Sequence, residues 1–255
     1  MDGPSENFWT TLPLGCGVTL LACDANGVAA LNKPAGVLSH PNSPADEERS
    51  LLVAHYDAGN ELFAWKPTGG DGGGSSKLWL LNRLDSVTSG VILVAASEKL
   101  AREIKARFKR KQVRKIYRAL VFGVPARPRQ IWRDRLDIDK RGGRIRTSAG
   151  TGVPAECSMR LVRTQPGPRP MALLQLEPRS GRSHQLRVQC ARRSLPIAGD
   201  ANYGDFKRNH ELAQRTGHRR LFLHSLETSF DYELAGKKFS FSAHAPLPPE
   251  FEGFF

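Results

Sequence analysis

Cysteines and long apolar runs are both scarce in this sequence, and each scarcity excludes a class of protein. The 255 residues include only four cysteines. Neither CxxC pairs nor the Cys/His spacing of zinc ligands occur, so we predict neither a bound metal nor a disulfide framework. No run approaches the roughly 18 to 20 apolar residues of a membrane span. The polar, acidic segment 1–10 is unlike a secretory signal. We therefore expect neither a membrane protein nor a secreted one.

Acidic residues are outnumbered in this chain. The 38 lysines and arginines exceed the 25 aspartates and glutamates, which gives a net charge of +13. Such an excess bears on partners rather than on fold, and a phosphate backbone is the commonest partner for a basic surface. A basic protein can also stay soluble by self-repulsion, so charge alone leaves both interpretations open. With 40% hydrophobic residues the chain can bury a full core.

Composition along the chain predicts a short arm followed by one large domain. Residues 1–17 carry proline, glycine and serine with little pattern, and we interpret them as a flexible N-terminal arm before a domain at 18–255. Residues 68–76, TGGDGGGSS, lack the strand-to-helix context and the lysine of a phosphate-binding loop. We interpret them as a flexible insertion within that domain.

Hydrophobic periodicity and turn residues predict a chain of short strands with few helices. The dipeptide Asn26-Gly27 indicates a hairpin turn between two apolar runs. Helices are predicted over 51–56, where Ser50 would be the N-cap, over the residues that follow Ser97, and over 183–191. The predicted strands are 18–21, 28–31, 91–94, 116–122, 155–162, 171–177, 220–230 and 239–241, and loops or a hairpin are expected over 125–154.

A lone carboxylate, Asp85, stands on a turn before the apolar run 91–94. Burying an unpaired carboxylate is costly, so Asp85 needs a cation or hydrogen-bond donors nearby. Arg187 lies at the edge of the apolar face of its predicted helix, where a covered arginine must find an anion. We predict Asp85 as a reacting carboxylate and Arg187 as its counter-ion, which would lower the pKa of the acid. Asp85 could equally cap the turn, and the residues alone leave that alternative open.

The predicted helix after Ser97 ends in a dense run of cations. Cations at a helix C-terminus complement the helix dipole. The run KRKQVRK exceeds what the dipole requires, which favours contact with RNA. The residues of this run that we predict to bind RNA are Lys109, Arg110, Lys111, Arg114 and Lys115.

Five segments of the sequence stand out by their order and spacing: NRLDSVTSG at 82–90, KIYRALVFG at 115–123, SGRSHQLRVQ at 180–189, PIAGDANYG at 196–204 and RRLFLHSLETSF at 219–230. In this order they resemble the successive motifs of the RluA family of RNA pseudouridine synthases. The LNKPAG loop at 31–36 is similar to an earlier family segment. The resemblance therefore extends from about residue 18 to the C-terminus.

The resemblance implies a fold and a mechanism. The fold is a single mixed α/β (α+β) catalytic domain, with a long, bent, mainly antiparallel sheet flanked by helices and loops. Asp85 matches the aspartate that attacks the target uridine, and Arg187 matches the arginine that pairs with it. Tyr117 matches the tyrosine that stacks on the extruded uracil and helps to remove its carbon-bound proton, although a strand tyrosine is ordinarily packed in a core. No cofactor or metal is implied, because the reaction is an isomerisation without redox change.

The resemblance also implies that the partner is RNA. A folded stem hides the target base, so the enzyme must extrude it while basic residues hold the backbone. Arg83 is expected to occupy the gap that the extruded base leaves. Arg182, His184 and Gln185, in the segment of Arg187, are further expected RNA contacts.

The chain departs from the family pattern at two positions. Asn82 stands where the family usually has histidine, and Gln189 stands where a histidine follows the HQLRV segment. The favoured function is conversion of uridine to pseudouridine in a structured RNA, with ribosomal RNA preferred. The alternative is a catalytically weak or inactive RNA-binding factor in ribosome assembly that keeps the same fold. No targeting segment decides between mitochondrion and cytoplasm.

Overall fold

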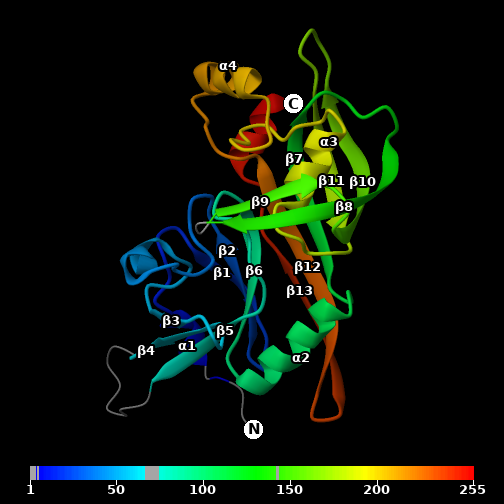
Figure 1. The fold of residues 1–255 in the computed structure, drawn as a ribbon. Helices are drawn as coiled ribbons and strands as arrows, with labels where there is room; N and C mark the ends of the chain where they lie inside the picture. The colour runs from blue at the N-terminus through cyan, green and yellow to red at the C-terminus, as the bar shows by residue number, and fades with distance from the viewer. Residues whose placement is uncertain (1–3, 5, 67–74, 142–143) are drawn as a thin grey trace. The chain divides into compact units, whose positions relative to one another are not determined.

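The computed structural model describes residues 4, 6–66, 75–141 and 144–255 (Figure 1). The chain divides into two compact units. Unit 1 consists of Met1–Val113 and Glu227–Ala245, and unit 2 consists of Arg114–Leu226 and Pro246–Phe255. Each unit has a hydrophobic core of its own. The predicted insertion 68–76 lies outside the described residues except for its last two positions, of which Ser76 begins a strand.

Unit 1 is built on strands in the order β3-β4-β5-β6-β12, and the pairs from β3 to β6 are antiparallel. Strand β2 pairs antiparallel with both β1 and β6, and β13 pairs antiparallel with β12. All seven residues of β6 are buried, as the continuous apolar run predicts. The Asn26-Gly27 turn joins β1 to β2, which confirms the predicted hairpin. The strands are β1 Thr19–Cys23, β2 Val28–Lys33, β3 His55–Asp57, β4 Leu62–Trp65, β5 Ser76–Leu80, β6 Ser89–Ala95, β12 Leu223–Leu234 and β13 Lys237–His244.

The helix after Ser97, α2, spans Glu98–Lys109 as the pattern predicts. The Ser97 hydroxyl accepts a hydrogen bond from the Leu100 backbone N–H, which satisfies one of the N–H groups at the start of the helix. Leu100 and Ile104 are fully buried in the core of unit 1. The opposite face carries i,i+4 ion pairs, Glu98 with Arg102 and Glu103 with Arg107.

The predicted helix over 51–56 is wrong. Leu51 and Leu52 are both fully buried, and their backbone is held by strand-like hydrogen bonds to the residues before β1. The Gly15 N–H donates to the Leu51 carbonyl at 3.0 Å, and the Val53 N–H donates to the Pro13 carbonyl at 2.7 Å. A short 3-10 helix instead precedes this segment, at Pro44–Arg49, and Ser50 ends that helix rather than beginning another.

The segment 1–17 is packed over its described part, in contrast to the loose attachment that its composition suggests. Residues Glu6–Thr10 form helix α1, and Trp9 and Leu12 are buried, with 6% and 8% of their surfaces exposed. Leu14 forms a β-bridge with Leu52. These buried side chains and the bridge to Leu52 attach the described part of the segment to unit 1.

Unit 2 has strands in the order β12-β7-β11-β10-β8-β9, and the pairs from β7 to β9 are antiparallel. These strands are β7 Arg114–Phe122, β8 Arg129–Arg141, β9 Arg144–Ala149, β10 Val153–Gln165 and β11 Met171–Pro178. The hairpin expected within 125–154 is β8–β9. Helix α3, Gln185–Arg192, confirms the predicted helix, and its Leu186 and Cys190 join the core formed by these strands. The unit ends in a 3-10 helix, Pro249–Phe254.

Helix α4, Phe206–Thr216, has no counterpart in the predicted elements. Asp205 caps it by accepting a hydrogen bond from the Arg208 N–H at 3.0 Å. Only Leu212 is buried among its described residues, so the helix lacks the apolar stripe from which helices are predicted. The antiparallel pairing and the flanking helices confirm the predicted mixed α/β fold class.

The cap of α2 generates a stability prediction. Ser97→Ala should lower the free energy of unfolding by about 1 kcal/mol in urea titrations, because an N–H at the start of α2 loses its acceptor. Ser43→Ala is the matched control, since Ser43 precedes the 3-10 helix Pro44–Arg49 but makes no side-chain cap bond to it. Equal losses in the two variants would contradict the assigned cap.

Candidate active site

The three predicted catalytic residues divide between the two units. Asp85 belongs to unit 1, whereas Tyr117 and Arg187 belong to unit 2. Asp85 and Tyr117 are half-buried, and Arg187 is buried with 4% of its surface exposed. Each residue is held by contacts within its own unit.

Asp85 lies on the loop between β5 and β6, and backbone hydrogen bonds fix the loop on both sides of it. Its own carbonyl accepts from the Thr88 N–H at 2.9 Å, which closes the turn through the main chain. Before Asp85, the Ser39 hydroxyl donates to the Leu84 carbonyl at 2.7 Å and accepts from the Leu84 N–H at 3.0 Å. The loop that carries the predicted nucleophile is therefore bound to the loop that carries Ser39.

A buried ammonium, that of Lys33, joins the same two loops. Lys33 ends β2 and is fully buried. Its Nζ donates to the carbonyls of Pro34 at 3.0 Å, Val37 at 2.7 Å and Ser86 at 3.0 Å. A buried charge is expensive unless its donors are satisfied, so these bonds fix the backbone directly after Asp85. Sequence reasoning did not assign Lys33 this role, although the LNKPAG segment was the signal.

Asn82, the first departure from the family pattern, has a local structural role. Its side-chain carbonyl accepts from the Leu93 N–H of β6 at 2.8 Å. Because Leu93 lies in the middle of a fully buried strand, the bond fixes the start of the Asp85 loop to the core of unit 1.

Arg83, the residue expected to fill the space of an extruded base, is exposed next to Glu61. Its side chain is 62% exposed, and its guanidinium lies 4.0 Å from the Glu61 carboxylate. Glu61 also accepts a hydrogen bond from Lys105 of α2 at 2.8 Å. Ion pairs this exposed contribute little energy, so Glu61 does not prevent the predicted contact of Arg83 with RNA.

Arg187 has a buried carboxylate partner, Asp200, that the sequence did not predict. Its Nε and Nη2 atoms each donate to one oxygen of Asp200 at 2.8 Å, and Asp200 is 1% exposed. The expectation that a covered Arg187 must find an anion is therefore confirmed. Its predicted pairing with Asp85 stays a prediction. The two-pronged contact leaves the guanidinium plane with one orientation.

Asp200 is held as an anion by its surroundings. Burial by itself raises the pKa of Asp200. The hydrogen bonds and the charge of Arg187 lower the pKa by more than this, and the backbone N–H groups of Asn202 and Tyr203 lower it as well. The net pKa lies below the usual range for aspartate. Asp200 therefore carries a negative charge beside Arg187 at neutral pH.

The ring of Tyr203 packs against the Arg187 guanidinium. The Arg187 Cζ lies 5.1 Å from the centre of the Tyr203 ring, and the Tyr203 hydroxyl is 2.8 Å from His184 Nδ1. The same hydroxyl accepts from the Thr147 N–H of β9 at 3.0 Å. His184, one of the predicted RNA contacts, is half-buried before α3 and is thus linked to the support of Arg187.

Gln185 and Gln189 form a chain of buried amides along α3. Gln185 accepts from the Ser180 hydroxyl at 2.8 Å and donates to Gln189 at 3.1 Å. Gln189 donates to Asp134 of β8 at 2.7 Å, so the second departure from the family pattern is satisfied inside unit 2. Gln185 is 3% exposed, and its hydrogen bonds order the segment before α3. Its predicted contact with RNA stays a prediction.

Tyr117 and Lys115 lie on the same face of β7, because side chains alternate along a strand. Tyr117 packs partly against the core that contains Leu186 and Cys190 of α3. The Lys115 ammonium lies 3.4 Å from the Ser180 carbonyl, and burial lowers the pKa of Lys115 to about 8. Lys115 is therefore still mainly protonated at neutral pH.

The other predicted RNA contacts are on the surface. Lys109, Arg110 and Lys111 are exposed at the end of α2, and Arg182 is exposed before α3. Arg114 is also exposed, with its guanidinium 3.2 Å from the Glu177 carboxylate. These positions are compatible with phosphate contact.

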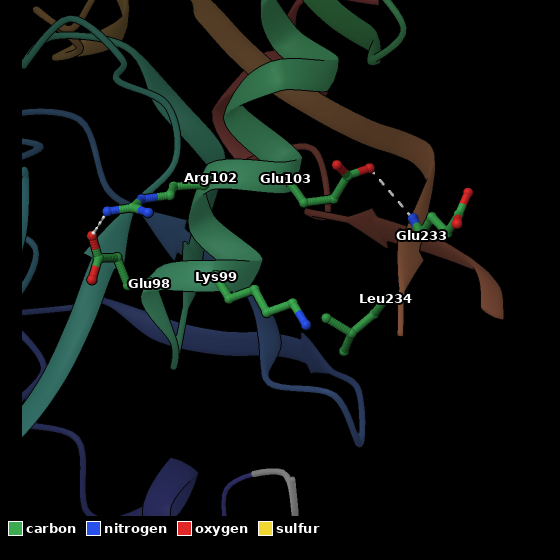
Figure 2. A pocket seen from close by; sticks show the side chains of 6 residues that line it. All are labelled: Glu98, Lys99, Arg102, Glu103, Glu233 and Leu234. Carbon is green, nitrogen blue, oxygen red and sulfur yellow. Dashed lines mark hydrogen bonds and ion pairs between the residues drawn. The ribbon is translucent and has the colours of Figure 1, made fainter. Parts of the chain in front are cut away.

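A hollow elsewhere in unit 1 contains none of the predicted site residues. Figure 2 shows it between the first turns of α2 and the end of β12. Arg102 pairs with Glu98 at its edge, and the Glu103 carboxylate accepts a hydrogen bond from the Glu233 backbone N–H at 3.5 Å. Over the described part of the chain, no group of three or more metal-ligating side chains is suited to hold a metal ion. No helix there is long and apolar enough to span a membrane.

Comparisons with known proteins agree on one family. Residues 27–192 match the family model described as RNA pseudouridylate synthase. A curated relative, ribosomal large subunit pseudouridine synthase C of Vibrio cholerae, is 32% identical over 222 residues, which are 87% of this chain and 64% of that protein. The tRNA pseudouridine synthase C of Yersinia pestis is 29% identical over 230 residues, covering 87% of this chain and 84% of the relative.

Two solved structures share the fold. Human RNA Pseudouridylate Synthase Domain Containing 1 aligns with a TM-score of 0.66 and 19% identity, over 93% of this chain and 87% of that one. Human RNA Pseudouridylate Synthase Domain Containing 4 aligns with a TM-score of 0.61 and 21% identity, over 91% and 90%. At these identities the likeness shows the fold alone.

The buried pair in unit 2 predicts a pH-dependent stability. Asp200→Asn should lower the free energy of unfolding at pH 7 by roughly 3 to 5 kcal/mol, because Arg187 would stay buried without its carboxylate. The folded pKa of Asp200 is below its unfolded value, so its contribution is present above about pH 4 and is lost as the pH falls through the folded pKa. The difference between wild type and variant should therefore shrink on acidification.

Urea titrations in steps from pH 7 to pH 3 measure this difference. Glu98→Gln is the matched control, because it removes a carboxylate whose side chain is 56% exposed and should change stability by under about 1 kcal/mol. A loss in Asp200→Asn no larger than that of the control, or one that grows as the pH falls, would refute the assigned pair.

Proposed function

The chain belongs to the RNA pseudouridylate synthase family, and from this premise we propose that it converts a uridine to pseudouridine in a structured RNA, with ribosomal RNA the favoured class. The main support for this proposal is the Asp85 loop, whose backbone is fixed before Asp85 by Ser39 and after it by Lys33. The net charge of +13 supports an RNA partner. Because relatives are named for both ribosomal and transfer RNA, experiments should offer both substrates.

In the proposed reaction Asp85 is the nucleophile. Its carboxylate attacks the ribose C1′, the bond between C1′ and the base N1 breaks with its electron pair going to the base, and the freed base turns. C5 of the base then attacks C1′ and the Asp85 carboxylate leaves. C5 loses its proton and N1 gains one, so the product is an isomer of the substrate. A fixed loop supports this role, since holding a reacting group in place removes much of the entropic barrier.

We assign Arg187 to pairing with the Asp85 carboxylate and Tyr117 to stacking on the uracil and assisting proton removal from C5. The support for Arg187 is its fixed orientation between Asp200 and Tyr203. Asp200 and Tyr203 are positioning residues, because they act through Arg187. The support for Tyr117 is its half-buried ring, which is anchored on the core yet partly open to solvent.

The RNA backbone is proposed to lie along exposed cations while Arg83 fills the space of the extruded uridine. Arg83 supports that role because it is mostly exposed and lies two residues before Asp85. The remaining proposed contacts are Lys109, Arg110, Lys111, Arg114, Lys115, Arg182 and His184. We propose an intracellular location, mitochondrion or cytoplasm, which mapping of pseudouridines in both RNA pools from cells lacking the protein would test.

Tritium release tests the activity. RNA labelled with tritium at uracil C5 should lose tritium to water with the wild-type protein, because C5 exchanges its hydrogen for the bond to ribose. Asp85→Asn should reduce release at least a thousandfold while leaving the unfolding midpoint and RNA affinity near wild type, since the amide keeps the shape but cannot act as the nucleophile.

The alternative function makes the opposite prediction. A ribosome assembly factor that only binds RNA would bind ribosomal RNA tightly and release no tritium from any cellular RNA. That outcome would overturn the proposed enzyme.

The end of α2 is tested by the salt dependence of binding. Replacing Lys109 and Arg110 together by glutamate should weaken binding to RNAs of every sequence and reduce the slope of log affinity against log salt by roughly one to two. Lys237 and Lys238, exposed at the start of β13, provide a control pair with the same change of charge. The control should keep the wild-type slope. If the variant at Lys109 and Arg110 keeps it too, or loses no more than the control, the end of α2 lies outside the RNA interface.

A further inference from the structure

Two aromatic side chains of unit 1, His40 and Tyr56, form a parallel stack. Their ring centres are 4.7 Å apart, and the ring planes differ by 9°. Tyr56 also contacts Phe63, at 4.8 Å between ring centres, and Phe63 is fully buried. Tyr56 of β3 lies directly opposite Phe63 of β4 in the ladder. The stack is thus anchored in the core at one end, and its outer ring is that of His40.

The stack is attached to the loop of the proposed nucleophile. His40 directly follows Ser39, whose hydroxyl is hydrogen-bonded in both directions to Leu84, the residue before Asp85. Arg83 and Glu61 both act on the Tyr56 phenol electrostatically, so their charged groups lie near the stack. Aromatic faces, cations and the proposed nucleophile are therefore gathered within one unit.

The chemistry of the stack is that of a nucleobase site. His40 and Tyr56 are each half-buried, so neither is sealed in the core. His40 Nδ1 lies 3.0 Å from the Pro41 carbonyl, which can only accept, so this nitrogen is the donor of that hydrogen bond. Proteins recognise unpaired bases by stacking them on histidine, tyrosine or phenylalanine rings and by hydrogen bonds to the base edges.

We propose that one nucleobase adjacent to the target uridine stacks on the His40 ring, which itself stacks on Tyr56. His40 thereby helps to select which uridine is modified. This inference rests on the proposed function, because the base is presented only when the RNA is bound at Asp85. A purine is the preferred occupant, since its larger ring covers more of the imidazole. His40 is accordingly a specificity-determining residue, and Tyr56 positions it.

The test compares variants on ribosomal RNA transcripts labelled with tritium at uracil C5. His40→Ala should raise the enzyme concentration needed for half-maximal single-turnover release by roughly tenfold, because the flanking base loses its stacking partner. The maximal rate should change much less, since the reacting atoms are untouched. His40→Phe should restore most of the loss by restoring an aromatic face. His55→Ala, at an exposed histidine of β3, is the matched control and should resemble wild type.

The decisive measurement uses RNA that lacks the flanking base. Replacing the flanking nucleotide that stacks on His40 by an abasic one should weaken RNA binding by the wild type and leave RNA binding by His40→Ala unchanged. The two proteins should then bind this RNA with the same affinity. A tenfold gap that persists on abasic RNA at both flanking positions would show that His40 acts through the fold, which overturns the proposal. Tritium release by the wild type together with unchanged release by His40→Ala would also overturn it while leaving the proposed function intact. No release by the wild type would instead remove the proposed function and this inference together.

Discussion

A buried ammonium is the constraint on which the organisation of unit 1 depends. The Lys33 side chain has three donors and no exposure, and its three carbonyl partners come from its own loop and from the loop of Asp85. Because a buried charge that loses its partners is strongly destabilising, the two loops cannot separate without a large loss of free energy. Ser39 and Asn82 add neutral hydrogen bonds to the same arrangement. The carboxylate of Asp85 is thereby carried on backbone that is fixed before RNA arrives.

Unit 2 uses the same principle with the opposite charge. Arg187 is covered by protein, so its guanidinium needs an anion, and Asp200 supplies one in a two-pronged contact. The Asp200 loop is in turn held by Asn209, whose amide donates to the Asp200 carbonyl at 2.9 Å and whose carbonyl oxygen accepts from the Gly199 N–H at 2.7 Å. This gives α4 a purpose that its poor apolar pattern conceals. It delivers Asn209 to the loop that orients Arg187.

The sequence predicted those features whose causes are local. The Asn26-Gly27 hairpin, the Ser97 cap and the apolar stripe of α2 each depend on residues within a few positions of one another. The helix expected over 51–56 failed because hydrogen bonds from residues 13–15 decide the backbone there. The roles of Lys33 and Asp200 could not be found from spacing, since a buried charge is recognised only by its surroundings. The residues around Asp85 fit a turn cap and a nucleophile equally well. The resemblance to a family, rather than a physical argument, favours the nucleophile.

The buried charges also bear on whether this chain uses its active site. Folding alone does not require them, because well-packed apolar residues of similar volume often serve as well or better than a buried ion pair. A factor that binds RNA only through its basic surface would need neither Lys33 nor the pair of Arg187 with Asp200. Asn82 and Gln189, the two departures from the family pattern, are both hydrogen-bonded within their own units and leave these charges undisturbed. The departures therefore alter how the loops are supported, and the charged groups of the proposed mechanism retain their support.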